Sequence, residues 1–406
     1  MSAQYSELSL NITKSVSKAE KKEFGIFITP RIIIELLVKQ VLTHIASNSI
    51  TKILEPSCGT CEIINYCDSI FENVIIDGIE YNDTIYQHIK NMKFKNMVLL
   101  THCDFMEFNA ITNYDLIIGN PPYFVCKKMD MPSKYHSFCV GRPNIFGLFI
   151  IHSLSLLKTG GILAFIIPKS FLNSLYYALI RNYIKETCQI LDILDFGKVN
   201  EFIDTDQATF GLIIQKYTVP IISDCKFSLK INSGFIFATD TLKLKQLFEG
   251  STTLEKMGLK VRTGQIVWNE HKEELTDNKD DTLLIYNTNI SKDNKLEIKK
   301  FKNDAKGQYI KLDGRIDPIL LVNRGNGNSA YKLNYAIVIN EGPYLIENHL
   351  NEIYSPTKMS KEELLTIYEK ITNSFKNTKT QQFIELFLGN NGLSKTELES
   401  IFPIYF

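Results

Sequence analysis

The sequence predicts an α/β protein built on a doubly wound, largely parallel sheet, and three observations support this fold class. Apolar stretches of strand length alternate with stretches of helical periodicity from residue 31 to residue 216. Several apolar stretches end at a polar side chain followed by a short loop, as at Glu55, Glu80 and Asn120. The chain has 406 residues, 44% of them hydrophobic, which allows two or three domains with sizeable cores. Strands that alternate with helices in this way form parallel sheets covered by helices.

Charge and cysteine content narrow the class of protein. Lys and Arg together number 45, as do Asp and Glu, so the formal net charge is zero and no global basic excess marks a nucleic-acid binder. All eight cysteines lie at or before residue 225, and Cys58 and Cys61 form the only close pair, so we expect free thiols and no metal site. The amino terminus lacks an apolar signal core, and the long apolar stretch over 145–168 is interrupted by polar residues. We therefore expect a cytoplasmic protein without a membrane segment.

The chain begins with a polar stretch, residues 1–22, which we expect to be a loose amino-terminal arm. After Phe24-Gly-Ile-Phe-Ile-Thr-Pro30 comes an amphipathic stretch that ends near Leu42. Thr29 is a good N-cap residue and Pro30 is tolerated at the first helical position, so we expect a helix to begin here. An ordinary capped helix explains this segment as well as a ligand contact does.

A loop of small residues follows the first strand. Residues 50–55 form a short apolar strand that ends at Glu55, and Pro56-Ser57-Cys58-Gly59-Thr60 leads into the next helix. Small side chains let a backbone approach a ligand closely, which makes this loop a candidate cofactor contact. The second strand, 74–80, ends at Glu80 about twenty positions further on, the spacing at which a carboxylate binds ribose hydroxyls. A simple turn and a solvated strand end remain alternatives.

The third strand, 97–105, ends at Asp104-Phe105. A hydrogen-bond acceptor beside an aromatic ring suits an adenine, with the carboxylate on its amino group and the ring on its face. Such a pair more often marks a strand end and a plug for the core, so the adenine contact depends on the other segments.

The fourth strand, 114–118, runs directly into Gly119-Asn120-Pro121-Pro122-Tyr123, the segment on which the functional prediction depends. Each proline fixes its own φ angle and pushes the preceding residue toward extended backbone, so the Asn120 side chain is held in one direction. The Asn120 amide oxygen and the Pro121 carbonyl can each accept an N–H bond from an exocyclic amine, which makes its nitrogen more nucleophilic. Tyr123 can stack on the flat face of a base. A Pro-Pro turn capped by an asparagine is the alternative.

Three more strands and two helices complete the predicted sheet. Residues 144–157 are apolar on almost every helical face, which predicts a buried helix, and Lys158-Thr-Gly-Gly161 is expected to end it. The remaining segments are a strand over 162–167, a helix over 170–187, a strand over 190–196 and a last strand that ends at Lys216.

In their order and spacing, the segments over 24–216 resemble the gamma class of S-adenosylmethionine-dependent DNA adenine-N6 methyltransferases of restriction–modification systems. The resemblance implies a seven-stranded class I methyltransferase sheet, which is Rossmann-like, and S-adenosylmethionine as the cofactor. It assigns cofactor contacts to Thr29, Glu55, Ser57, Cys58, Gly59, Glu80, Asp104 and Phe105. It assigns catalysis to Asn120, Pro121, Pro122 and Tyr123, and contact with the flipped-out adenine to Tyr123 and Phe202. The family often has a further glycine where Cys61 stands.

The carboxy-terminal half is predicted to be an α+β target-recognition domain. The resemblance implies an arm at 1–22, the catalytic domain at 23–220, a linker at 221–245 and the DNA-binding domain at 246–406. Residues 261–267, 318–327 and 346–353 resemble landmarks of such domains, and helices are expected over 364–388. Arg324, in a loop of Gly and Asn, can reach a phosphate or a guanine edge, or can be an exposed structural arginine.

The implied reaction is transfer of a methyl group from S-adenosylmethionine to N6 of an adenine flipped out of duplex DNA. Double-stranded DNA is then the partner, together with a cognate restriction endonuclease that acts on the same site, and we expect a monomer. Two alternatives stay open. One is a methyltransferase that acts on an RNA adenine or on a protein glutamine amide, and the other is a non-catalytic DNA-binding module with a methyltransferase fold.

Overall fold

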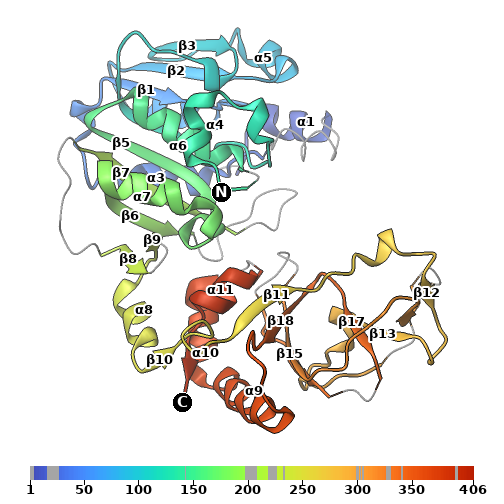
Figure 1. Cartoon of the computed structure of the whole chain (residues 1–406). Coiled ribbons are helices and arrows are strands. Elements are labelled where there is room, and N and C mark those ends of the chain that lie inside the picture. The colour runs from blue at the N-terminus through green and yellow to red at the C-terminus, as the bar shows by residue number, and fades with distance from the viewer. Residues whose placement is uncertain are drawn as a thin grey trace. The chain divides into compact units, whose positions relative to one another are not determined.

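The computed structural model describes residues 4–15, 27–141, 143–196, 208–217, 226–231, 234–298, 301, 303, 306–325, 331–339, 342–388 and 392–406. The chain forms two compact units, Met1–Thr241 and Leu242–Phe406 (Figure 1). Each unit has its own sheets and its own apolar core. No helix in the described residues is long and apolar enough to cross a membrane.

The amino-terminal unit is organised around a seven-stranded sheet with the order β3-β2-β1-β4-β5-β7-β6. Its strands are β1 (Lys52–Glu55), β2 (Ile75–Glu80), β3 (Met97–His102), β4 (Tyr114–Gly119), β5 (Leu157–Pro168), β6 (Cys188–Asp195) and β7 (Thr209–Lys216). Neighbours are parallel, except that β7 is antiparallel to both β5 and β6. The predicted class I methyltransferase sheet is confirmed. Its strand order reverses between β1 and β4, and open α/β sheets bind ligands at such a switch point.

Helices cover both faces of this sheet, as the alternation of strands and helices predicts (Figure 1). Apolar side chains of α3 (Arg31–Val41), α4 (Glu62–Ile70) and α5 (Asp83–Ile89) share the core of one face. Those of α6 (Ile145–Leu156) and α7 (Ala178–Thr187) share the core of the other face. Helix α6 is buried along almost its whole length, which confirms the prediction of a buried helix. Short 3₁₀ turns complete the unit: η1 (Ser47–Ser49), η2 (Phe105–Glu107), η3 (Lys128–Asp130), η4 (Ser133–Phe138), η5 (Lys169–Leu172) and η6 (Leu175–Tyr177).

The predicted cap of helix α3 is wrong. Pro30, in extended conformation, precedes the helix, and no side chain caps its first turn. The Thr29 hydroxyl accepts a hydrogen bond from the Asn120 amide at 3.1 Å instead. A good local capping residue is thus used for a contact with a segment far along the chain.

The predicted end of helix α6 is also wrong. The helix ends at Leu156, and Lys158-Thr-Gly-Gly161 lies inside β5 rather than at a helix terminus. Tyr114 of β4 pairs with Leu157, whereas Leu116 pairs with Ile162, so the pairing shifts in register across these residues. The two glycines therefore lie in a bulge of the sheet, where Gly160 adopts φ +81°, a conformation that favours glycine.

The predicted loose arm is ordered over part of its length. Residues 7–15 form helix α1 (Glu7–Ser15), in which Ser9 is 1% and Ile12 is 4% exposed. A helix this short is marginal on its own in water, so contacts with the rest of the unit must stabilise it. The local sequence pattern does not show those contacts.

A hairpin lies within the segment that was expected to be a linker. Strands β8 (Ser228–Ile231) and β9 (Gly234–Phe237) pair antiparallel, and β9 packs on α7. The buried Arg181 of α7 donates to the Phe235 carbonyl at 2.6 Å, and the Asn182 side chain accepts from the Phe235 N–H at 3.1 Å. These residues therefore belong to the amino-terminal unit.

The carboxy-terminal unit contains two four-stranded sheets, with the orders β11-β18-β15-β16 and β12-β14-β13-β17. Its strands are β10 (Ser251–Thr252), β11 (Lys260–Thr263), β12 (Leu275–Thr276), β13 (Thr282–Ile285), β14 (Tyr309–Ile310), β15 (Ile319–Asn323), β16 (Tyr335–Val338), β17 (Tyr344–Ile346), β18 (Leu350–Tyr354) and β19 (Ile404–Tyr405). Its helices are α8 (Thr241–Phe248), α9 (Lys361–Phe375), α10 (Thr378–Phe383) and α11 (Lys395–Ser400), with the 3₁₀ turns η8 (Trp268–Glu270) and η9 (Asn287–Asn289) and the π-helical segment η10 (Ile384–Leu388). The helices expected over 364–388 are confirmed.

Candidate active site

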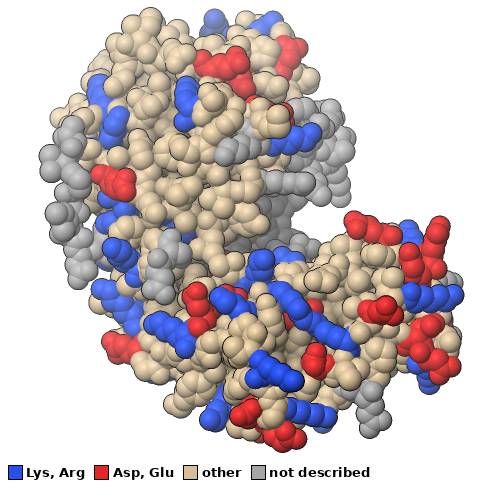
Figure 2. All heavy atoms as spheres, viewed as in Figure 1, with Lys and Arg blue, Asp and Glu red and all other residues tan. Residues whose placement is uncertain are grey.

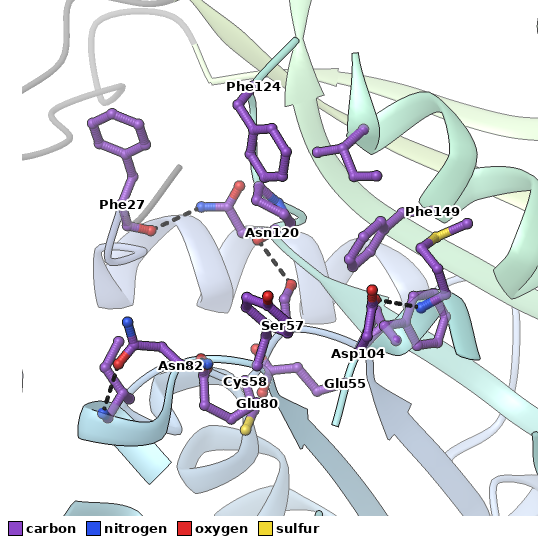
Figure 3. A pocket seen from close by; sticks show the side chains of 18 of the residues that line it. Phe27, Glu55, Ser57, Cys58, Glu80, Asn82, Asp104, Asn120, Phe124 and Phe149 are labelled. Carbon is purple, nitrogen blue, oxygen red and sulfur yellow. Dashed lines mark hydrogen bonds between the residues drawn. The ribbon is translucent and has the colours of Figure 1, made fainter. Parts of the chain in front are cut away.

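A cavity of about 710 Å³ lies at the carboxyl ends of β1, β2 and β4, at the switch point of the sheet (Figure 3). The predicted site residues that line it are Thr29, Glu55, Ser57, Cys58, Gly59, Glu80, Asp104, Phe105, Asn120 and Pro122. Pro121 and Tyr123 are not part of this lining, and Phe202 lies outside the described residues. The structure thus brings together residues that five separate segments of the sequence contribute.

The loop after β1 leaves room for a ligand beside its backbone. Gly59 has φ +50°, and a Cβ built on it would meet no atom within 4 Å. The Cys58 N–H bonds to the Ile79 carbonyl at 2.8 Å, which holds the loop against the end of β2. Cys61 also has a positive φ, +63°, although it carries a side chain. The glycine-like backbone of the loop is therefore kept even where the residue is not glycine.

Glu80 joins this loop to the end of β2. Its Oε2 accepts the Gly59 N–H at 2.8 Å, and its Oε1 accepts the Asn82 N–H at 2.7 Å. Burial raises the pKa of Glu80, and these two N–H bonds oppose the rise. Each carboxylate oxygen keeps a second lone pair, so Glu80 can still accept two hydroxyl groups.

Glu55 is buried, and one of its oxygens has no hydrogen-bond partner within the described part of the chain. Burial raises the pKa of Glu55 well above its usual value, and the nearby Cys61, Glu80 and Glu62 add to the rise. A buried polar atom without a partner is rare in folded proteins and calls for an explanation. Because Glu55 lies in the cavity wall, a donor group on a ligand is a natural partner.

Asp104 and Phe105 place a fixed acceptor beside an apolar ring. Asp104 Oδ1 accepts the Met106 N–H at 2.8 Å, which holds the exposed carboxylate at the start of a 3₁₀ turn. The Phe105 ring is 4.8 Å from the Phe149 ring and 4.7 Å from the His152 ring, measured between centroids. Phe105 is therefore both a core residue and part of the cavity wall. Together, Asp104 and Phe105 offer an acceptor for the amino group of a purine and an apolar surface for its ring.

Asn120 is held at the cavity wall by two other segments of the chain. Its Nδ2 donates to Thr29 Oγ1 at 3.1 Å and to the Phe27 carbonyl at 3.3 Å. Its main-chain carbonyl accepts the Ser57 hydroxyl at 3.2 Å (Figure 3). The side-chain amide is therefore fixed against residues 27–29, and the backbone of Asn120 is fixed against the loop that follows β1.

Tyr123 turns its hydroxyl toward Asn120. The hydroxyl contacts Asn120 Oδ1 and lies 2.7 Å from the Ile166 carbonyl, while the ring meets the edge of Phe146 at a centroid distance of 5.9 Å. Burial raises the pKa of Tyr123 well above its usual value, so the hydroxyl keeps its proton. Phe124, the next residue, lines the cavity. Stacking of Tyr123 on a base stays a prediction.

The cavity is also lined by residues that the sequence did not single out, among them Tyr81, Asn82, Phe124 and Phe149. Asn82 could have been predicted from the sequence, because it follows Glu80 closely and asparagine is a favoured N-cap residue. Its side chain caps α5 by accepting the Ile85 N–H at 3.0 Å. Phe149 could not have been predicted, because α6 is apolar on almost every face and no sequence pattern marks the side that faces the cavity.

The predicted DNA-contacting segments of the carboxy-terminal unit meet one another in space. The Asn348 N–H bonds to the Ile266 carbonyl at 2.9 Å, and the Arg324 N–H bonds to the His349 carbonyl at 3.1 Å. The Arg324 guanidinium donates to the Asn348 carbonyl at 2.9 Å. Part of this guanidinium thus has a structural role, and its contact with DNA stays a prediction.

Comparison with known families identifies the amino-terminal half. Residues 2–202 match the family model of the Eco57I restriction-modification methylases. These residues belong to the Eco57I restriction-modification methylase family. The chain is thus an enzyme, a restriction–modification DNA methyltransferase, and S-adenosylmethionine is its cofactor.

Relatives of this methylase match it over its full length. The chain is 27% identical to the Type II methyltransferase M.CvrRI of Paramecium bursaria Chlorella virus XZ-6E, over 99% of both chains. It is 26% identical to the modification methylase CviBIII of Paramecium bursaria Chlorella virus NC1A, again over 99% of both. Among solved structures, it is similar to a "putative class I S-adenosylmethionine-dependent methyltransferase" of Listeria monocytogenes, with a TM-score of 0.42 and 18% identity over 53% of this chain and 66% of that one.

The cavity of the methylase suits S-adenosylmethionine in its charge and shape. The cofactor carries more positive than negative groups, and the cavity wall contains several carboxyl groups, among them Glu62, Glu80 and Asp104, beside the cation Lys127. The unpartnered oxygen of Glu55 and the open space beside Gly59 offer an acceptor and room for close approach. Within the described residues, no group of three or more His, Cys, Asp or Glu side chains is placed to hold a metal ion.

Proposed function

We propose that this methylase transfers a methyl group to N6 of an adenine that is flipped out of duplex DNA. The observation that carries the proposal is the position of Asn120, whose amide lies in the wall of the same cavity as Glu80 and Asp104. The Ser57–Asn120 hydrogen bond connects the loop after β1 with the loop after β4. A base amine that reaches Asn120 therefore arrives beside the cofactor site.

Asn120 and Pro121 activate the adenine amine. The amine is a weak nucleophile, because its lone pair is delocalised into the ring. The Asn120 amide oxygen keeps a second lone pair beside the bond from Tyr123, and that lone pair accepts one N–H of the amine. The Pro121 carbonyl accepts the other N–H, and the two acceptors draw electron density onto the nitrogen. Bonds from Asn120 to Phe27 and Thr29 keep the amide from rotating as this happens.

Tyr123 supports the same amide and meets the base. Its hydroxyl holds Asn120 in the orientation described, and its ring, with Phe202, stacks on the flipped adenine. Stacking of a base on an aromatic ring contributes about 1–3 kcal/mol, which offsets the cost of taking the base out of the duplex. Pro122 sets the backbone between the amide and the ring.

The remaining wall residues bind the cofactor. Glu80 accepts the ribose hydroxyls, Asp104 and Phe105 bind the adenine ring, and Thr29, Glu55, Ser57, Cys58 and Gly59 surround the methionine part. When bound, S-adenosylmethionine supplies an electrophilic methyl group; the acceptor nitrogen gains that methyl and releases one proton, and the sulfonium becomes a neutral thioether. The chain's own residues hold both reactants and exclude water.

Recognition of the DNA site belongs to residues 246–406 in this proposal, and the catalytic domain to residues 23–220. The division of the chain into two compact units, Met1–Thr241 and Leu242–Phe406, is in keeping with this assignment. Lys and Arg side chains lie among Asp and Glu side chains on the face of the carboxy-terminal unit in Figure 2, in keeping with the zero net charge. Specific contacts rather than a global basic field then select the site. The enzyme acts as a monomer beside a cognate restriction endonuclease.

The variant Asn120→Ala tests the proposed role of the amide. We expect methyl transfer to duplex DNA to fall by at least about a hundredfold, the usual cost of removing one preorganised group at a reacting centre. Binding of S-adenosylmethionine, measured by titration calorimetry, should change little. The exposed Asn109, replaced by Ala, is the matched control and should leave both quantities unchanged. Normal transfer by Asn120→Ala would refute the role, and labelling of RNA or of a protein glutamine in place of DNA would refute the substrate.

A further inference from the structure

Helix α1 is joined to the segment after β1 by a set of hydrogen bonds that the proposed reaction does not use. The Ser6 N–H donates to Glu62 Oε1 at 2.8 Å, and the Ser9 hydroxyl donates to the same oxygen at 2.5 Å. Ser9 Oγ also lies 2.6 Å from Thr60 Oγ1, in a buried contact between residues 51 positions apart. Because the Ser9 proton is given to Glu62, the Thr60 hydroxyl is the donor in the second contact. We call these four residues the latch.

Glu62 is well placed to hold α1. It is the first residue of α4, and it accepts bonds from Ser6 and Ser9 at the start of α1, so one carboxylate lies at two helix N-termini. A negative charge at such a terminus is stabilising, because it meets the positive end of the helix dipole. Since α1 is too short to persist by its own hydrogen bonds, it depends on contacts with the rest of the unit, and the latch adds to the packing of Leu8 and Ile12.

Helix α1 also contributes to the cavity. Ile12, one turn after Ser9, lines the cavity, and so do Thr60 and Glu62. Ser9 and Ile12 are buried, whereas Leu10 of the same helix is 39% exposed, so α1 has one face on the cavity wall and one face outside. If α1 left this position, the cavity would lose part of its wall and Thr60 would lose its partner.

We propose that Ser9 and Glu62 are positioning residues that hold α1 as a wall of the S-adenosylmethionine site, so that affinity for the cofactor depends on the latch. This inference rests on the assignment of the cavity to the cofactor. A site that is complete only when α1 is latched binds the cofactor with an affinity reduced by the fraction of molecules that are unlatched. The cofactor in turn favours the latched state.

The full-length enzyme allows a direct test in which hydrogen exchange of residues 7–15 and the dissociation constant of S-adenosylmethionine are measured together. For Ser9→Ala and Glu62→Ala we expect faster exchange in α1 and an increase of about tenfold in the dissociation constant, in line with the loss of a hydrogen bond to a charged group. Glu62→Gln keeps an acceptor oxygen, so its effect should be smaller than that of Glu62→Ala. Leu10→Ala removes an exposed side chain of the same helix and should change neither quantity.

Each outcome decides between the latch and a simpler role for α1. If Ser9→Ala speeds exchange in α1 but leaves cofactor affinity unchanged, α1 is only a packing element and the inference is wrong. If exchange in α1 stays slow in Ser9→Ala, the hydrogen bonds do not hold the helix and the inference is also wrong. Glu80→Ala separates this failure from failure of the cofactor assignment. Loss of binding in Glu80→Ala with normal binding in the latch variants overturns the latch alone, whereas normal binding in Glu80→Ala overturns the assignment of the cavity.

Discussion

At the scale of single residues, the buried Glu55 lowers the stability of the fold at high pH, while its unpartnered oxygen is available to bind the cofactor. Its carboxyl group is buried, one oxygen is unpartnered within the described residues, and its pKa is raised by burial and by neighbouring acidic groups. A raised pKa in the folded state means that the folded protein holds this proton more tightly than the unfolded chain. The contribution of Glu55 to stability is therefore fully present below its unfolded pKa and is lost as the pH rises through the folded pKa.

Replacing Glu55 by glutamine should therefore stabilise the cofactor-free protein at high pH. We expect the free energy of unfolding at pH 8 to rise by about 1–3 kcal/mol, because the neutral amide removes the cost of burying a group that the unfolded chain ionises at this pH. The gain should shrink toward pH 5, because the unfolded chain then begins to take up the same proton. Urea unfolding at both pH values measures it, with Glu107→Gln as the exposed control. A variant that is less stable than the wild type at both pH values would contradict this explanation.

Cys61 adopts backbone angles that suit glycine. It has φ +63° and is fully buried at the start of α4. Left-handed backbone destabilises the folded state by about 1–2 kcal/mol for a residue with a Cβ. Replacement by glycine removes this strain, but it also makes the unfolded chain more flexible, which reduces the net gain in stability.

The comparison of Cys61→Gly with Cys61→Ala isolates this strain. Both variants lose the buried sulfur, but only alanine keeps the Cβ. We expect the glycine variant to be more stable than the alanine variant by about 0.5–1 kcal/mol in urea unfolding. Equal stability, or a more stable alanine variant, would show that the loop tolerates a side chain here without strain.

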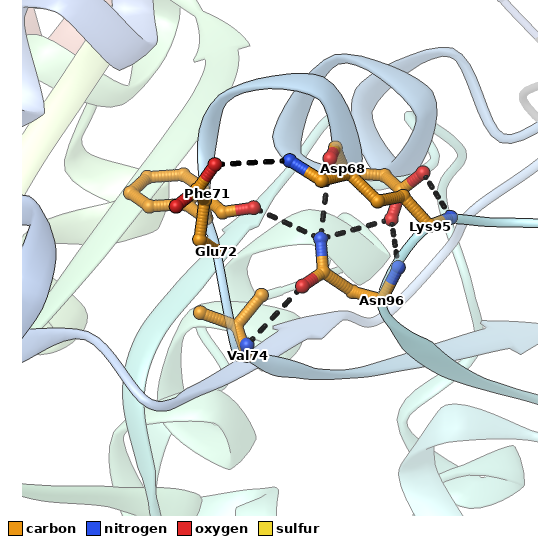
Figure 4. A network of polar contacts seen from close by, with 6 residues as sticks. All are labelled: Asp68, Phe71, Glu72, Val74, Lys95 and Asn96. Carbon is orange, nitrogen blue, oxygen red and sulfur yellow. Dashed lines mark hydrogen bonds and ion pairs between the residues drawn. The ribbon is translucent and has the colours of Figure 1, made fainter.

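At the scale of elements, a polar network built on Asn96 joins α4 to the strands at the far end of the sheet (Figure 4). Asn96 Nδ2 donates to the Asp68 carbonyl at 3.1 Å, to Asp68 Oδ1 at 3.0 Å and to the Phe71 carbonyl at 2.9 Å, and its Oδ1 accepts the Val74 N–H at 3.3 Å. Burial alone would raise the pKa of Asp68, but N–H groups of Lys95 and Asn96 outweigh it and lower the pKa. One side chain thus fixes the end of α4, the start of β2 and the entry to β3.

Replacing Asn96 by alanine should destabilise this edge of the sheet without touching the cavity. We expect a loss of about 2–3 kcal/mol in the free energy of unfolding, because several half-buried backbone and carboxylate groups lose their partner together. Asn91→Ala, at an exposed position before the same strand, should cost less than about 0.5 kcal/mol. Thermal unfolding of both variants measures the difference, and similar melting temperatures would mean that the network carries little of the stability.

The elements that the sequence predicted well are those whose signal is local. Buried parallel strands read as continuous apolar runs, so β4 and β5 were found, and α6 was found because it is apolar all round. Long-range partners decided the rest. Thr29 could not be placed by its capping preference because its hydroxyl meets Asn120, 91 positions away. Helix α1 was missed because its stability depends on Thr60 and Glu62.

At the scale of the whole molecule, the sequence located the cavity but not its detailed contacts. Strand ends of a doubly wound sheet converge at the switch point, so Glu55, Glu80 and Asn120 were expected close together, and they line one cavity. The hydroxyl of Tyr123 was not expected to meet Asn120 and the Ile166 carbonyl, because that contact depends on how β5 lies beside the catalytic loop. Contacts of this kind follow from packing and not from residue type.

The most direct test of the proposed reaction is mass spectrometry of the nucleosides in plasmid DNA taken from cells that express the full chain. If Asn120 and the Pro121 carbonyl activate an adenine amine, N6-methyladenine should appear with the wild-type enzyme and should be absent with Asn120→Ala. Methylated cytosine with no N6-methyladenine, or N6-methyladenine at the same level with Asn120→Ala, would contradict it.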